Sequence, residues 1–212
     1  MMRNLAGPLA IVAAVALAAP ARSEPTFGSQ SPATAVFAGG CFWGIEGVFE
    51  HVKGVTSATA GYAGGAVASP SYEQVSSGAT GHAEAVRVTY DPSQVTYQQL
   101  LEVFFTVAHD PTQLNRQGPD RGTQYRSIVF YGDSAQRHAA EAYVAELTNK
   151  RAFAKPVVTE IVPLKAFYEA EAYHQHYMAR HPRALYIVYN DAPKVASLER
   201  QFPALYRKPI PE

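Results

Sequence analysis

The chain has one cysteine, and the residues around it would suit a reactive thiol. Cys41 lies in the segment GGCFWG, residues 39–44, between two glycines and the aromatic pair Phe42 and Trp43. A cysteine that loses its proton is a nucleophile, whereas a free cysteine in a core packs as a small hydrophobic side chain. The glycines permit a tight turn that leaves the sulfur open, and the two rings offer an apolar wall beside it. At this level both interpretations, nucleophile and packing residue, stay open.

A second candidate group is Glu84, at the start of the segment EAVRVTYD, residues 84–91. The alternation of this segment puts Glu84 on its apolar face. A carboxyl group on an apolar face loses hydration, so its pKa rises and it can stay protonated near neutral pH and donate a proton. The alternative is structural: Glu84 begins the strand at a solvated end, or pairs with Arg87 or Arg126.

Further polar side chains fall in the loops that would surround such a site. Tyr62, Tyr72 and Tyr125 lie in or beside these loops, and a phenol can bind a polar oxygen while its ring packs. Asp120 lies in the segment GPDRG, where it serves either a site or a turn. Because the chain has 13 tyrosines, position alone does not separate a site tyrosine from a structural one.

Three histidines, His174, His176 and His181, gather in YHQHYMARHP without forming a metal motif. Residues two apart on a helix point in different directions, and the sequence has neither H-E-x-x-H nor paired cysteine ligands. We therefore predict surface or core histidines and no metal site, with a supporting hydrogen bond from one of them. The sequence also lacks a P-loop and a G-x-G-x-x-G turn between strand and helix, so no nucleotide cofactor is predicted.

The predicted elements place Cys41 where a strand joins a helix. The segment TAVFAGG before it is typical of a short buried strand, and apolar side chains recur at helical spacing over residues 42–52. Free backbone N–H groups and the positive end of the dipole at a helix start favour a thiolate. Gly44 and Gly47 weaken this helix, each by up to about 1 kcal/mol relative to Ala, and are interpreted as points of close approach.

The rest of the chain alternates between strand and helix patterns and predicts an α+β fold. Residues 54–65 are predicted to begin as a strand and to end in a glycine-rich loop. Further strands are predicted at residues 84–91, 125–132 and 157–164, and helices at residues 96–110, 134–150, 169–181 and 192–202. This order indicates a two-layer sandwich around a split βαβ, ferredoxin-like core with an irregular helical C-terminus. The glycine-rich stretch that leads up to residue 84 is predicted to be a long loop.

The N-terminus has the layout of a secretory signal peptide. Residues 1–23 combine Arg3, an apolar run too short to span a bilayer, and small residues before the expected cleavage point. Residues 24–33 predict a flexible leader and residues 34–212 a folded domain. We expect an exported, periplasmic protein with no stable membrane insertion after cleavage. Lys and Arg together number 18, as do Asp and Glu, so no net charge attracts nucleic acid.

Five blocks, in order, resemble the type A peptide methionine sulfoxide reductases. They are GCFWG, GYAGG, GHAEAVRVTYDP, HDPTQLNRQGPDRGTQYRS and YHQHY, and the resemblance extends over residues 35–177. It implies an α+β fold and an enzyme that reduces the S epimer of methionine sulfoxide, free or within proteins, to methionine. The implied substrates are therefore oxidised proteins or peptides that contain this residue.

The resemblance also implies a role for each candidate residue. By this resemblance, Cys41 is the nucleophile that becomes a sulfenic acid, and Phe42 and Trp43 form the pocket for the substrate's methyl group. Glu84 is implied to donate a proton to the sulfoxide oxygen. Tyr72 and Tyr125 are implied to help hold this oxygen, with Asp120 as a polar residue close by. The residue types fit the chemistry, because a sulfoxide sulfur becomes electrophilic once its oxygen gains a proton or strong hydrogen bonds.

The chain departs from many members of that family because it has no second cysteine that could react with the sulfenic acid. We therefore predict no bound cofactor and an external thiol reductant. This reductant is either a small thiol or a thioredoxin-like or glutaredoxin-like protein that forms a mixed disulfide with Cys41.

Two other functions are compatible with the residues. In a cysteine hydrolase, Cys41 would attack an acyl carbon with His82 or His109 as the base. In a non-enzymatic binding module, the aromatic pocket would hold a methionine-like ligand and the thiol would stay idle. A hydrolase consumes no reducing equivalents and an idle thiol gains no oxygen, so both alternatives can be tested.

Overall fold

The computed structural model describes residues 31–208. The predicted signal peptide, residues 1–23, and residues 24–30 of the predicted leader lie outside the described part. The first strand begins at Ala33, one residue before the predicted start of the domain. Each helix between residues 31 and 208 is too short or too polar to cross a membrane.

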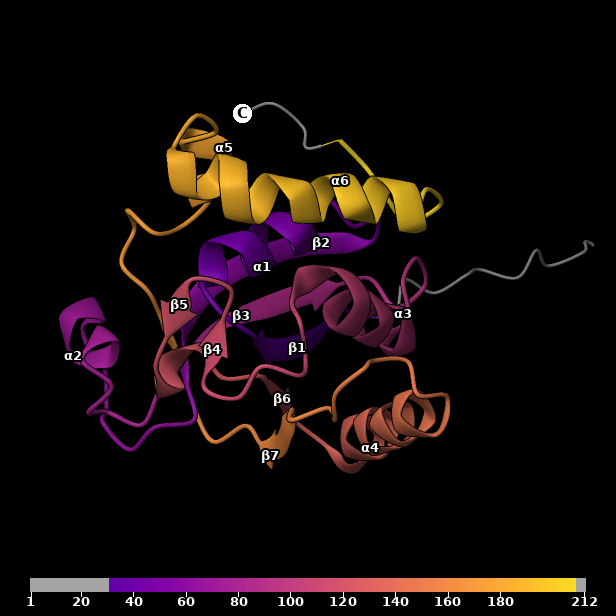
Figure 1. The fold of residues 1–212 in the computed structure, drawn as a ribbon, viewed down its shortest axis with the longest axis horizontal. Helices are drawn as coiled ribbons and strands as arrows, with labels where there is room; N and C mark the ends of the chain where they lie inside the picture. Colours follow the sequence, from indigo (N-terminus) through magenta and orange to yellow (C-terminus); the bar gives the residue numbers. More distant parts are fainter. Residues whose placement is uncertain (1–30, 209–212) are drawn as a thin grey trace, which may run out of the picture.

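The structure consists of eight strands and a set of mostly short helices (Figure 1). The strands are β1 (Ala33–Ala38), β2 (Val55–Ala63), β3 (Ala83–Tyr90), β4 (Arg116–Gln117), β5 (Asp120–Arg121), β6 (Ile128–Tyr131), β7 (Glu160–Pro163) and β8 (Phe167–Glu169). The α-helices are α1 (Phe42–Glu50), α2 (Tyr72–Ser76), α3 (Tyr97–Val103), α4 (Ser134–Asn149), α5 (Tyr177–Arg180) and α6 (Ala192–Gln201). Two π-helical turns, η1 (Phe104–Ala108) and η3 (Ile187–Asp191), and a 3-10 turn, η2 (Thr123–Tyr125), complete the set.

Six strands form one sheet in the order β7-β6-β1-β3-β2-β8, and β4 and β5 form a separate hairpin. The four central strands are antiparallel in the order β6-β1-β3-β2, which is the arrangement of a ferredoxin-like split βαβ core. β7 adds to β6 in parallel. The predicted α+β class and its core are therefore confirmed.

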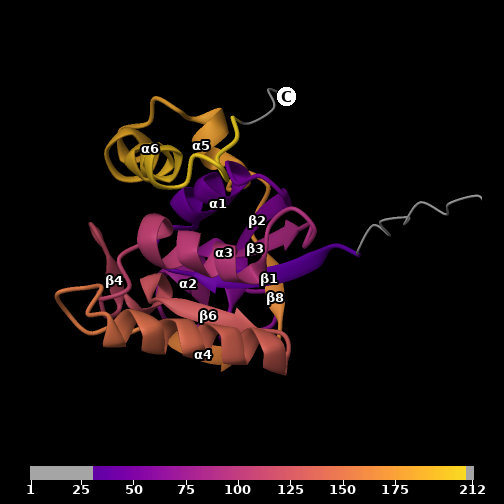
Figure 2. The ribbon, with the colours of Figure 1, turned by 90° about the vertical axis from the view of Figure 1, so that its right-hand side faces the viewer.

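The main core lies between the sheet and the helices α1, α3 and α4 (Figure 2). Phe37 of β1 stacks against Phe49 of α1 at 5.3 Å and against Phe104 of η1 at 4.7 Å between ring centroids. These three rings are wholly buried and fasten the helix layer to the sheet. α6 packs on α1 and η1 and forms, with α5, the irregular C-terminal cover (Figure 1).

The helix predicted at residues 169–181 is wrong. The chain there finishes β8, passes through turns and becomes helical only in α5. The cause is Gln175, whose Nε2 donates to the carbonyl oxygens of Ala60 and Ala170, each at 2.9 Å, while its Oε1 accepts from the N–H of Ala60 at 2.9 Å. These bonds hold the segment against β2, a long-range effect that overrides the local helical pattern.

Candidate active site

Cys41 occupies the turn between β1 and α1, at the N-cap of α1. Gly40 before it has a φ of 105°, a left-handed conformation that favours glycine. A Cβ on Gly40 would also lie 2.6 Å from Cγ of Gln117, so packing requires glycine as well. The predicted strand-to-helix join is confirmed, and the cysteine keeps an exposed fraction of 8%.

The side chain of Cys41 rests as a thiol. Burial, and after it the charges of Glu84 and Asp191, raise its pKa well above the usual value. The backbone N–H of Trp43 lowers the pKa of Cys41. The backbone N–H of Phe42 instead donates to Oε2 of Glu84 at 3.0 Å. This raised pKa contradicts the thiolate predicted from the helix start.

Glu84 lies on the core face of β3 with an exposed fraction of 2%. Burial raises its pKa to about 8, the N–H of Phe42 opposes this shift, and the charge of Asp120 adds to it. Glu84 is therefore protonated at neutral pH. The alternative pairing fails, because Arg87 and Arg126 form ion pairs with glutamates of β8 and β7.

The indole of Trp43 forms an apolar wall beside Cys41. Three aromatic neighbours hold this indole in place. Its indole stacks on Tyr177 with ring centroids 3.7 Å apart and planes at 10°, and Tyr186 meets it edge-on at 5.8 Å. Its Nε1 donates to Nδ1 of His174 at 3.1 Å, which is the supporting histidine bond that the sequence left open. Phe42 is 1% exposed, and its ring packs against His174 and Tyr62 with ring centroids 4.9 Å and 5.9 Å apart.

Tyr72 and Tyr125 approach the same point from two segments far apart in the chain. Tyr72 is the first residue of α2, a short helix with a capping box inside the predicted loop, and Tyr125 ends η2. Burial, and next the charge of Glu84, raise the pKa of both phenols, to about 12 for Tyr72. The ionised form of Cys41 would also raise both pKa values, so both phenols lie within electrostatic range of the thiol and the acid.

Asp120 is joined to the site by a residue that the sequence did not indicate. The hydroxyl of Tyr186 donates to Oδ2 of Asp120, which links the β4–β5 hairpin to the C-terminal cover. Asp191 is a second buried acid, wholly unexposed, with Lys194 Nζ 3.0 Å from its Oδ1. Its charge raises the pKa of Cys41, so the pair belongs to the surroundings of the thiol.

Glu171 and Tyr62 form a support for α2. Oε2 of Glu171 accepts from the Tyr62 hydroxyl at 2.7 Å, and Oε1 accepts from the backbone N–H of Tyr72 at 2.8 Å. Tyr62 is wholly buried, so this phenol is structural. Sequence reasoning missed Glu171 because its partners are 109 and 99 residues away along the chain, with no local pattern to reveal them.

Both histidines considered as a hydrolase base use their ring nitrogens elsewhere. His109 Nδ1 donates to the carbonyl of Phe104 at 2.9 Å, and its Nε2 bonds Ser127 Oγ at 2.7 Å. Burial lowers the pKa of His109 to about 4. His82 Nδ1 accepts from the Gly65 N–H at 3.1 Å, and its Nε2 bonds a backbone carbonyl. Neither ring has a free nitrogen for Cys41, which disfavours the hydrolase alternative.

The sequence also matches known proteins over most of its length. A family model described as peptide methionine sulfoxide reductase matches residues 33–205. The chain belongs to this family. It is accordingly a methionine sulfoxide reductase, as the five sequence blocks implied.

Individual relatives of this reductase agree with the family match. A peptide methionine sulfoxide reductase MsrA 2 of Mesorhizobium japonicum is 57% identical over 178 residues, which cover 84% of this chain and 91% of the relative. The peptide methionine sulfoxide reductase MsrA of Natronomonas pharaonis is 52% identical over 170 residues, 80% of this chain and 95% of the relative.

Solved structures of the family resemble the fold of this chain. Mxr1 of Saccharomyces cerevisiae in reduced form has a TM-score of 0.68 at 35% identity, over 76% of this chain and 92% of that one. Methionine sulfoxide reductase A of Corynebacterium diphtheriae has a TM-score of 0.64 at 37% identity, over 74% of this chain and 78% of that one.

Proposed function

We propose that the enzyme reduces the S epimer of methionine sulfoxide by transferring the sulfoxide oxygen to Cys41. The observation that carries this proposal is the buried, protonated Glu84, fixed through Oε2 by the first N–H of the helix that begins beside Cys41. With Oε2 bound to the backbone, Oε1 is the oxygen that carries the acidic proton. A neutral acid next to a thiol suits a substrate whose oxygen must be protonated before its sulfur can be attacked.

The reaction balances with the groups at hand. Glu84 gives its proton to the sulfoxide oxygen as the sulfur of Cys41 attacks the sulfoxide sulfur, and the thiol proton passes to the Glu84 carboxylate. The bond between the two sulfurs and the sulfur–oxygen bond of the substrate then break as the hydroxyl moves to Cys41, which becomes a sulfenic acid. The substrate sulfur gains two electrons and the cysteine sulfur loses two, so methionine leaves while Glu84 holds its proton again.

Two features of the site support selection of one epimer. The rigid indole of Trp43 offers an apolar surface for the methyl group, while Glu84, Tyr72 and Tyr125 surround the place for the oxygen. If methyl and oxygen are each bound on a fixed side, only one configuration at sulfur presents its open face to Cys41. Asp120 lies close enough to raise the pKa of Glu84 and so helps to keep the acid protonated.

An external thiol completes the cycle in this proposal, because Cys41 is the only cysteine. One thiol displaces water from the sulfenic acid and forms a mixed disulfide, and a second thiol releases Cys41 and leaves as a disulfide. The exposed apolar side chains Tyr173, Leu185 and Tyr189 stand close in sequence to the residues that hold Trp43. They support a protein partner, of thioredoxin-like or glutaredoxin-like type, in addition to small thiols.

The test is a comparison of the two epimers with the full chain and dithiothreitol. We expect methionine to form from the S epimer only, with one disulfide of the reductant for each methionine. Equal rates for both epimers would contradict the specificity, and methionine formation without thiol consumption would contradict the redox cycle. No product from folded protein would favour the binding module with an idle thiol.

A further inference from the structure

A second group of reactive side chains lies between α1 and the start of α5. Glu46, Glu50 and His176 each offer one oxygen or nitrogen, and these atoms lie within 4.8 Å of one another. The two glutamates are four residues apart on α1 and therefore share a face. His176 is brought to them by a left-handed backbone, with a φ of 53°, directly before α5. The histidine spacing along the chain could not show this group, because two of its members come from α1.

Glu46 has an oxygen whose surroundings point to a missing partner. The residue is wholly buried. Oε2 accepts the backbone N–H of His176 at 2.9 Å, but Oε1 is buried with no hydrogen-bond partner among residues 31–208. An unsatisfied buried carboxylate oxygen is costly, so such a group is normally paired or bound to a metal.

The other two groups can close on an ion at low cost. Nδ1 of His176 already contacts a carboxylate oxygen of Glu50. Their side chains are 41% and 17% exposed, so both have room to move. Ligand atoms on a tetrahedral zinc ion, bonded at about 2.0–2.2 Å, lie about 3.4 Å apart, and the three atoms need shifts on the order of 1 Å to reach that geometry.

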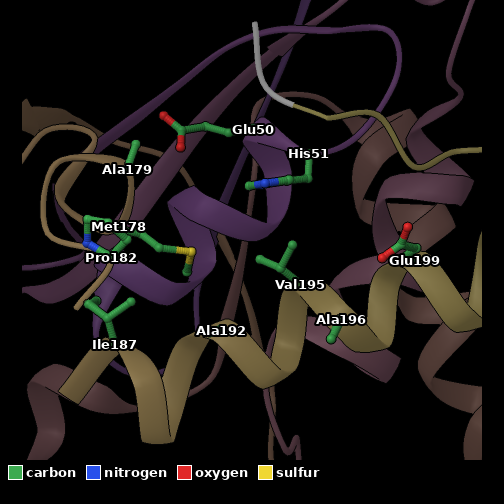
Figure 3. A pocket seen from close by; sticks show the side chains of 10 residues that line it. All are labelled: Glu50, His51, Met178, Ala179, Pro182, Ile187, Ala192, Val195, Ala196 and Glu199. Carbon is green, nitrogen blue, oxygen red and sulfur yellow. The ribbon is translucent and has the colours of Figure 1, made fainter. Parts of the chain in front are cut away.

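We propose that Glu46, Glu50 and His176 bind a divalent transition-metal ion, for which Zn²⁺ is the best match. Carboxylate oxygen and imidazole nitrogen are ordinary zinc ligands, and water would take the fourth position. Glu50 also lines a groove between α1 and α6, together with Met178 and Glu199 (Figure 3).

A bound ion would connect this site to the catalytic wall. The ion would join α1 to the residue directly before Tyr177, the ring on which Trp43 stacks. Binding would therefore stabilise the position of the indole, in addition to satisfying Glu46. This inference is independent of the proposed oxygen transfer, since none of the three ligands takes part in it.

The test is calorimetric titration of Zn²⁺ into the full chain with Cys41→Ser, which removes the thiol as a competing ligand. We expect one ion per chain, with affinity at least about tenfold lower after Glu50→Gln or His176→Asn. Glu199→Gln is the matched control, because it removes a carboxylate from the same groove outside the cluster, and its affinity should be unchanged. Equal affinity in all four proteins, or no saturation below about 1 mM, would overturn the proposal.

Two further measurements distinguish a loss of Zn²⁺ binding from poor folding of a variant. Zn²⁺ should raise the melting temperature of the Cys41→Ser protein and of its Glu199→Gln form, but not that of the His176→Asn form. Crystals of the Cys41→Ser protein soaked in Zn²⁺ should show an anomalous peak between the three side chains. A peak at other residues, with none in this cluster, would overturn the assignment whatever the variants do.

Discussion

At the residue scale, the proposed chemistry depends on a carboxyl group that the fold keeps neutral. Glu84 is buried on β3 and has a pKa of about 8 in the folded chain, against an ordinary value of 4.5. Between these two pH values folding retains a proton that the unfolded chain releases. The native state is therefore progressively destabilised as the pH rises through this window, by on the order of 3 kcal/mol at pH 7.

The variant Glu84→Gln separates the effect of the Glu84 carboxyl group on stability from its proposed effect on catalysis. The amide keeps the shape and an acceptor for the N–H of Phe42, but it has no proton to give. We expect at least about 100-fold loss of sulfoxide reduction. The free energy of unfolding at neutral pH should rise, by about 1–3 kcal/mol, and the gain should vanish below about pH 4.5. Denaturant unfolding at both pH values checks this, and an active or less stable variant would contradict the role of Glu84.

The activity of the wild-type enzyme should decrease above about pH 8. At higher pH Glu84 loses its proton, so the sulfoxide oxygen is no longer protonated, although the Cys41 thiol ionises more readily. Measurement of kcat/KM across this range tests whether activity falls or rises with pH. Circular dichroism at each pH confirms that the chain stays folded. A rate that keeps rising beyond about pH 9 would indicate that thiol ionisation alone controls the reaction.

Close packing of α1 against the C-terminal cover positions the site at the element scale. A Cβ on Gly44 would lie 2.1 Å from Oδ1 of Asp191, in the buried pair with Lys194. A Cβ on Gly47 would lie 2.5 Å from Cε of Met178, the flexible end of a side chain. The two glycines predicted as points of close approach therefore meet neighbours that differ in how easily they yield.

Gly44→Ala should destabilise the protein more than Gly47→Ala does. Alanine favours a helix by up to about 1 kcal/mol, but at Gly44 the clash with a buried ion pair should reverse this into a loss of about 1–3 kcal/mol. At Gly47 the methionine can turn away, so the net change should be smaller. Chemical denaturation of the two variants and the wild type measures these changes in the free energy of unfolding. A Gly44→Ala protein more stable than the wild type would show that Asp191 moves freely.

The elements that the sequence predicts are those with strong local periodicity. β1, β3, β6 and α4 follow from alternation or from helical spacing, and the turn at Cys41 follows from its glycines. α2 was missed because five residues give no period, and the segment at 169–181 was misassigned because Gln175 binds the backbone of β2. Tyr186 and Glu171 had no sequence signal, because their hydrogen-bond partners lie far away along the chain. The candidate residues, by contrast, lie within the motif blocks.

At the scale of the whole molecule, the single thiol makes the proposed redox cycle dependent on an external reductant that can reach Cys41. Around the site the structure presents exposed apolar side chains, among them Leu185 at 71% and Tyr189 at 74% exposure. We propose that this surface receives the protein reductant. Tyr189→Ser should lower the rate with a thioredoxin-like protein several-fold and leave the rate with dithiothreitol unchanged. Equal effects on both rates would show that the change acts on the catalytic centre.

At the same scale, we propose that the whole chain is exported. Residues 1–23 are expected to direct the enzyme to the periplasm and to be removed after Ala21 or Ser23. The intact mass of the protein recovered from the periplasm of an expressing bacterium would identify the cleaved bond.

The most direct test of oxygen transfer is a single turnover without reductant, followed by mass spectrometry of the Cys41 peptide. The account predicts a gain of one oxygen, about 16 Da, on Cys41, trapped by dimedone and equal in amount to the methionine formed. Methionine formation with Cys41 unmodified, or undiminished reduction by Cys41→Ser, would contradict it.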